Sequence, residues 1–215
     1  MTTYDYFSIA YGALATVSLS LISIAIGVPL GLGFALIRWS RLPVFNQLTI
    51  AYVSIVRTCP SVTLVLLIFY ALPVVGISME PLPAGILTLT LSTAAFNTEI
   101  WRSALMNFPR DQYDAALSLG MRRGLRFRRV VLPQIIRNSL PALVNEMTLQ
   151  VKATPAVAVI GIVEITRAAI RVGARTYEPL PPFIVALVLY SLIVFAFVRT
   201  QRAVERRYAQ VGAHR

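Results

Sequence analysis

Cysteine and histidine are nearly absent from this chain of 215 residues, which contains one of each, Cys59 and His214. A lone cysteine cannot form a disulfide within the chain, and one cysteine with one histidine cannot supply the ligands of a metal site. We therefore expect neither a bound metal nor a disulfide framework. The first nine residues also lack a basic side chain, so the first apolar segment does not have the pattern of a removable signal peptide.

Charged residues are scarce as well. They make up 13% of the chain, against 57% hydrophobic residues and a mean hydropathy of +0.70, a composition typical of an integral membrane protein and not of a soluble domain. Acidic residues number 9 and basic residues 20, giving a formal charge of +11. Because the basic residues fall between long apolar segments, we do not interpret them as a nucleic-acid surface.

Long apolar segments predict an all-α integral membrane fold with five transmembrane helices. A bilayer core requires about 20 apolar residues per helix, and suitable segments lie at 10–37, 59–79, 81–98, 138–163 and 179–198. The fourth segment contains Glu146 and Lys152, which we expect to face the interior of a bundle because charges are costly in lipid. The shorter segment 42–56 is interpreted as an interfacial helix.

The distribution of arginine predicts the orientation, because cytoplasmic loops collect Lys and Arg. Segment 110–137 contains seven arginines, whereas no basic residue precedes the first span. We therefore predict an external N-terminus at 1–9, a single transmembrane domain at 10–200 with a cytoplasmic loop at about 107–133, and a basic cytoplasmic tail at 201–215.

That loop begins with a predicted short helix. Pro109 suits a first helical turn, and the acids Asp111 and Asp114 favour the positive end of the helix dipole. Ala115, Ala116 and Leu119 would offer a small, apolar face to a partner, and Gly120 can adopt the left-handed conformation that ends a helix.

An arginine cluster follows this helix. Gly124 permits a second bend, and the five arginines predict a helix at the lipid headgroups: Arg122, Arg123, Arg126, Arg128 and Arg129. From charge alone, a solvated basic loop that only fixes the topology is the simpler interpretation.

The order of residues changes that interpretation. Asp114-Ala115-Ala116, three residues, Gly120, nine residues, Val130, one residue and Leu132-Pro133 resemble the EAA motif of ABC importer permeases, in which Glu stands in place of Asp and Ile in place of Val. Further segments resemble the polar-amino-acid (histidine/glutamine/glutamate) permeases: Arg57-Thr58-Cys59-Pro60, Glu99-Ile100-Trp101-Arg102, Lys152-Ala153-Thr154 and Glu164-Ile165-Thr166-Arg167. Ala153 and Pro155 depart from the acid and the serine that the family usually has there.

The resemblance implies a type I ABC importer permease fold in a bacterial cytoplasmic (inner) membrane. Five helices per chain would form half of the translocation pore, completed by a second permease that is identical or a sister chain. The EAA helix would dock into a cytoplasmic ABC ATPase dimer through Asp114, Ala115, Ala116, Leu119 and Gly120. An external solute-binding protein would deliver the polar amino-acid substrate.

Phosphate-binding Gly-rich loops are missing: neither G-x-x-x-x-G-K-[ST] nor G-x-G-x-x-G occurs. We therefore expect a non-catalytic transport subunit without a cofactor of its own, with ATP and Mg bound by the partner ATPase. The Gly31-Leu32-Gly33 segment is interpreted as close helix packing instead. The alternative function is a self-contained ion-coupled carrier, which would normally contain internal repeats; no second copy of the 114–133 pattern is present.

Polar residues in the fourth span are candidates for the translocation path because ionisable groups inside a membrane are usually functional. The candidates are Asn145, Glu146, Lys152 and Thr154. The alternative is structural pairing of Glu146 with Lys152. Glu99 and Arg102 are three residues apart and are expected to pair with each other on one helical face.

Three arginines in the fourth connection recur every four residues: Arg167, Arg171 and Arg175. On a helix they would form one basic stripe at the outer face. We expect this stripe either to dock the binding protein or attract an acidic substrate, or to anchor at lipid headgroups.

Overall fold

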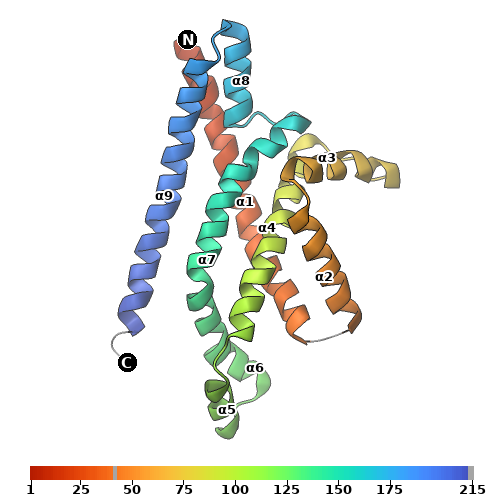
Figure 1. Ribbon diagram of the computed structural model, residues 1–215, viewed down its shortest axis with the longest axis vertical. Coiled ribbons are helices and arrows are strands. Elements are labelled where there is room, and N and C mark those ends of the chain that lie inside the picture. Colours follow the sequence, from red (N-terminus) through yellow and green to blue (C-terminus); the bar gives the residue numbers. More distant parts are fainter. Residues whose placement is uncertain (41–42, 213–215) are drawn as a thin grey trace.

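The computed structural model describes residues 1–40 and 43–212, and every regular element in these ranges is helical. Four long helices run along the molecule (Figure 1): α1 (Thr3–Ser40), α4 (Pro81–Met106), α7 (Leu132–Ala153) and α9 (Leu180–Gly212). Shorter helices are α2 (Pro43–Thr58), α3 (Ser61–Ala71), α5 (Arg110–Ser118), α6 (Arg123–Arg126) and α8 (Ile165–Thr176). The N-terminus and α8 lie at one end of the bundle, and α5, α6 and the C-terminal end of α9 lie at the other.

Two helices of the described chain are long and apolar enough to cross a membrane, α1 and residues Leu180–Thr200 of α9. The number rises to four if two bent helix pairs each count as one span. The predicted span 81–98 is a helix, α4, but hydroxyl and amide side chains interrupt its apolar residues. Many of these are buried, including Thr88, Thr93, Asn97 and Thr98, because α4 packs against α1, α2, α3 and α7 at the centre of the molecule.

The second predicted span, 59–79, is not one continuous helix. Pro60 precedes α3, and the chain bends by 118° between α2 and the segment Ser61–Val75. Proline disfavours helical backbone at the preceding residue, which explains the break. Because of this bend, α3 projects sideways from the bundle (Figure 1). A 3-10 turn, Leu72–Val75, follows α3 and ends at Gly76, which has φ of +84°.

The segment predicted as an interfacial helix, 42–56, packs along the bundle instead; residue 42 lies outside the described residues. α2 buries Thr49, Val53 and Val56, and the Tyr52 hydroxyl donates a hydrogen bond to the Leu91 carbonyl of α4 at 2.6 Å. These contacts make α2 part of the bundle.

The fourth predicted span, 138–163, begins earlier and breaks within its length. The α-helix starts at Leu132, continues through Pro141 and ends at Ala153, where a 3-10 segment, Thr154–Ile160, begins. The break coincides with Pro155, one of the two departures from the permease pattern. Gly161, with φ of +106°, ends the segment before α8.

The two ends of the chain continue the long helices of the bundle. α1 already begins at Thr3, and Asp5 and Ile9 are buried in it, so the predicted external segment 1–9 is helical and continuous with the first span. The expected tail continues α9 up to Gly212, and its last three residues lie outside the described part of the chain.

Close packing between α1 and α4 confirms the interpretation of Gly31. A Cβ atom at Gly31 would lie 2.9 Å from Asn97 Cβ, and one at Gly27 would lie 2.6 Å from Thr93 Cβ. The same interpretation does not hold for Gly33, whose Cβ position has no atom within 4 Å. Glycines at two successive helical turns therefore let the two longest central helices approach each other.

Candidate functional site

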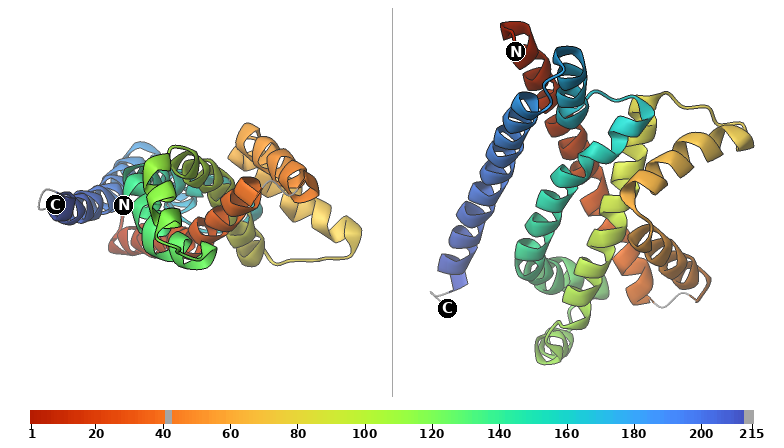
Figure 2. Two further views of the ribbon diagram at one scale, coloured as in Figure 1. Left: turned by 90° about the horizontal axis from the view of Figure 1, so that it is seen from below. Right: turned by 45° about the horizontal axis from the view of Figure 1, so that its top comes forward.

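The predicted loop helix exists as α5, a helix of nine residues that protrudes from the end of the bundle opposite the N-terminus (Figure 2). Pro109 immediately precedes it, and Asp111 lies in its first turn. Gly120 has φ of +71°, and the Gly120 and Met121 amides donate to the Leu117 and Ala116 carbonyls at 2.9 and 3.2 Å. This pair of bonds is a Schellman motif, so the predicted role of Gly120 in ending the helix is confirmed.

The predicted docking residues of α5 do not share one surface. Asp114, Ala115, Leu119 and Gly120 are exposed, and Leu119 is 81% exposed. Ala116 is 5% exposed and faces the protein, so the prediction that it offers a surface to a partner is wrong. Leu117, 55% exposed, was not predicted; helical spacing alone could not decide which flank of so short a helix faces inward.

The arginine cluster after α5 also divides. Arg122, Arg123, Arg128 and Arg129 are exposed, as expected of a basic surface. Arg126 is 6% exposed and its Nη2 donates to the Tyr113 hydroxyl at 2.7 Å, so its predicted headgroup position is wrong. Gly124 lies inside α6 and makes no second bend.

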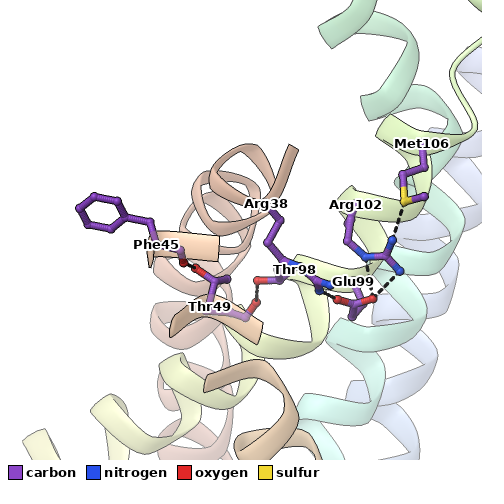
Figure 3. Close-up of polar contacts among 8 residues, drawn as sticks. Arg38, Phe45, Thr49, Thr98, Glu99, Arg102 and Met106 are labelled. Atoms are coloured by element: carbon purple, nitrogen blue, oxygen red, sulfur yellow. Dashed lines mark hydrogen bonds and ion pairs between the residues drawn. The ribbon is translucent and has the colours of Figure 1, made fainter. Parts of the chain in front are cut away.

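The predicted pair of Glu99 and Arg102 is confirmed and has a third member. Arg102 Nε and Nη2 donate to one Glu99 oxygen at 2.9 and 2.8 Å, and Arg38 of α1 binds the other oxygen. Figure 3 shows both guanidinium groups directed at the one carboxylate. The sequence showed the pair because it follows helical spacing, whereas Arg38 is 61 positions from Glu99 and could not be found that way.

A cavity of about 480 Å³ adjoins this cluster between α4 and α7, with one wall from α2. Its charged and polar lining residues include Arg57, Glu99, Asn138, Ser139 and Glu146. It therefore brings a carboxylate of α4, a carboxylate of α7 and a guanidinium of α2 around one space. Because Arg38 and Arg102 already pair with Glu99, Glu146 is the carboxylate of this lining that can accept an ammonium group, and Arg57 can bind a carboxylate; the pair suits a zwitterion.

Of the four predicted path residues, the cavity includes Glu146 alone. Asn145 and Lys152 are exposed elsewhere on α7. Thr154 is fully buried, and its hydroxyl donates to the Val151 carbonyl at 2.8 Å. No ion pair between Glu146 and Lys152 occurs in the described structure.

The predicted outer stripe of arginines is divided too. Arg167 donates to the Ala158 carbonyl, and Arg175 pairs with Asp5 at the start of α1, with its guanidinium carbon 5.7 Å from the centroid of the Tyr4 ring. Arg171 is exposed. Two members of the stripe therefore hold α8 to its neighbours, and Arg171 remains directed outward.

Glu164, to which the sequence assigned no separate role, is fully buried at the start of α8. Its carboxylate accepts hydrogen bonds from the Thr166 and Arg167 amides at 2.9 and 2.7 Å and from the Tyr190 hydroxyl of α9 at 2.7 Å. This is an N-cap that also joins α8 to α9. The sequence shows an acidic residue, Glu164, three residues before Arg167. The burial of Glu164 depends on tertiary contacts and could not be predicted from this spacing.

Comparisons with known proteins agree with this architecture. Residues 27–210 match the family described as binding-protein-dependent transport system inner membrane component. The chain is 37% identical over 194 residues to the nopaline transport system permease protein NocM of Agrobacterium fabrum, covering 86% of this chain and 80% of that protein. It is 33% identical over 218 residues to the histidine/lysine/arginine/ornithine transport system permease protein HisQ of Escherichia coli, covering 96% and 95%.

A solved structure is similar over nearly the same length. The crystal structure of an amino acid ABC transporter with histidines matches with a TM-score of 0.85 and 31% identity, covering 93% of this chain and 94% of that chain.

Proposed function

The chain belongs to the family of binding-protein-dependent transport system inner membrane components, and from this premise we infer that it is a permease subunit of an ABC importer for amino acids. The related permeases carry names that specify nopaline and histidine, lysine, arginine or ornithine transport. We propose a polar amino acid as the substrate of this chain. Glu146 and Arg57 at the 480 Å³ cavity support such a substrate, because they can pair with its ammonium and carboxylate groups.

The single observation that carries the coupling role is the geometry of α5. A short helix with exposed Ala115, Leu117 and Leu119 protrudes beyond the bundle and is closed by a left-handed glycine. We propose that this helix docks into a cytoplasmic ABC ATPase dimer. ATP and Mg would be bound and used there, and this chain would contribute no catalytic residue or cofactor.

The proposed membrane arrangement has five crossings: α1, the bent α2–α3 pair, α4, α7 and α9. A second permease, identical or a sister chain, would complete the pore. With α5 in the cytoplasm, the C-terminus lies inside, and the N-terminus and α8 lie outside at the opposite end of the bundle. The exposed Arg171 is then the strongest candidate among the three outer arginines for contact with a solute-binding protein.

Movement of α5 by the ATPase would reach the cavity through the segments that follow α5 in the chain. The chain continues from α6 through the π-helical segment Phe127–Val131 into α7, which contributes Asn138, Ser139 and Glu146 to the cavity. ATP-driven closure of the ATPase would move α5 and bias α7 between two arrangements. Glu146 is the proposed path residue with the strongest structural support, and Asn145, Lys152 and Thr154 are weaker candidates because they lie outside this cavity.

The test compares Gly120→Arg with Gly124→Arg. The first places a side chain on a backbone with φ of +71°, a strain of about 1–2 kcal/mol, at the residue that closes the docking helix. The second adds the same charge to a helical glycine with open space around it. We expect both variants to reach the membrane. Gly120→Arg should lose ATPase co-purification or amino-acid-stimulated ATP hydrolysis, and Gly124→Arg should keep both. Normal stimulation by Gly120→Arg at a normal membrane level would contradict the docking role.

A further inference from the structure

Arg126 differs from the arginines around it in its surroundings. Its Nη2 donates to the Tyr113 hydroxyl at 2.7 Å, and its guanidinium carbon lies 4.1 Å from the centroid of the same ring. A second nitrogen, Nη1, reaches the Met121 carbonyl at 3.4 Å. One buried cation therefore contacts both α5, through Tyr113, and the turn that follows α5, through Met121.

Few other contacts fix the direction of α5. Ala116 is the buried residue of this nine-residue helix, and helices this short are not stable in water without tertiary contacts. A hydrogen bond between Gln134 and Gln112 at 2.6 Å also reaches α5, but it is exposed to solvent, where water competes for both partners. The contact between the buried Arg126 and the half-buried Tyr113 is shielded better from water, and it is thus the strongest side-chain polar restraint on the helix.

Arg126 also lies between α5 and α7 in the chain. Arg126 is the last residue of α6, directly before the π-helical segment Phe127–Val131 that leads into α7. A displacement of α5 that is passed to Arg126 therefore reaches the base of the helix that lines the cavity. A charge-assisted hydrogen bond combined with stacking on a ring keeps both distance and angle, which a flexible loop cannot do.

We propose that Arg126 is a positioning residue for coupling, which holds α5 at a fixed angle to α7 so that movement of the ATPase is transmitted to the cavity. The proposal rests on the function proposed above. It assigns to one arginine of the basic segment a mechanical role, and to its exposed neighbours a role in surface charge alone.

The experiment compares Arg126→Gln with Arg129→Gln, which removes the same charge from an exposed position. Each variant is reconstituted with its ATPase and solute-binding protein, and ATP hydrolysis is measured with L-arginine, L-lysine or L-histidine as the stimulating amino acid. We expect Arg126→Gln to keep ATPase co-purification within about twofold of wild type. It should lower the ratio of stimulated to basal hydrolysis about tenfold, the order expected for one charge-assisted hydrogen bond, whereas Arg129→Gln should leave the ratio unchanged.

Tyr113→Phe provides an independent variant, because it removes the hydroxyl and keeps the ring that packs near Val131. It should lower the same ratio, and it should add no further loss in the Arg126→Gln background, since both changes break one contact. An unchanged ratio in Tyr113→Phe, equal losses in Arg126→Gln and Arg129→Gln, or additive losses in the double variant would overturn the proposal. A wild-type chain that binds no ATPase would contradict the proposed function itself, an outcome visible before any variant is compared.

Discussion

Glu164 has 0% exposure and three hydrogen-bond donors around its carboxylate. A buried carboxylate is costly unless it is fully hydrogen-bonded, and here the donors come from two helices. α1 closes the other side, because a Cβ at Gly12 would lie 3.0 Å from the Glu164 backbone and the Ile165 amide donates to Thr16 Oγ1 at 3.3 Å. This residue therefore joins three helices at the end of the bundle that carries the N-terminus.

Glu164→Ala should destabilise the protein by about 1–3 kcal/mol, because it removes the N-cap of α8 and a hydrogen-bond partner of Tyr190. Thermal unfolding in detergent measures the effect as a lower Tm. Glu178→Ala is the control, since Glu178 is exposed just after α8, and its Tm should stay near that of wild type. Equal Tm values for the two variants would show that the buried contacts contribute nothing.

Individual residues were predictable from sequence where local spacing determines them. Gly120 was predicted to end α5 because helix termination is a property of a few neighbouring residues, and Glu99 was paired with Arg102 because they share a helical face. Ala116 and Arg126 were assigned to surfaces and are buried. Their burial depends on α6 and the π-helical segment Phe127–Val131 packing against α5, which no local pattern specifies.

The contact between α1 and α4 is the central joint of the bundle. Gly27 and Gly31 face Thr93 and Asn97 at distances that leave no room for a side chain, as in membrane helices that associate through small residues. The Trp101 indole adds a hydrogen bond to the Val28 carbonyl at 3.1 Å. Close backbone approach and a buried indole together fix how these two helices cross.

Gly27→Leu should destabilise this joint by about 1–3 kcal/mol through overpacking, because its Cβ would lie 2.6 Å from Thr93 Cβ. Gly33→Leu is the matched control six residues along the same helix, where a Cβ would have no atom within 4 Å. The measurement is the fraction of each variant that stays monodisperse in detergent after graded heating. A Gly27 variant as heat-resistant as the Gly33 variant would mean that α1 and α4 do not pack as described.

The elements themselves were predictable to different extents. The apolar segments that became α1 and α9 were recognisable from length and hydropathy, and the start of α4 at Pro81 agrees with its prediction. The bend of 118° at Pro60 and the change to 3-10 geometry at Thr154 were not predicted. Hydropathy reports how apolar a segment is, whereas these breaks come from prolines whose effect on direction depends on the neighbouring helices.

The two ends of the bundle differ in their exposed arginines. The end with α5 presents Arg122, Arg123, Arg128 and Arg129, and the opposite end, with the N-terminus and α8, presents Arg171 and Arg175 (Figure 1). The richer end is the one that the proposed orientation places in the cytoplasm. In the orientation we propose, the energy of ATP hydrolysis enters at α5 and the substrate enters at the opposite end.

The most direct test of the proposed function is amino-acid uptake by proteoliposomes containing this chain with the proposed partner permease and ATPase. The solute-binding protein and labelled L-arginine, L-lysine or L-histidine are supplied outside, and ATP with Mg inside. We expect uptake that requires internal ATP and persists when ionophores collapse the proton and sodium gradients. Uptake driven by an ion gradient without ATP would contradict the proposed function and would identify an ion-coupled carrier instead.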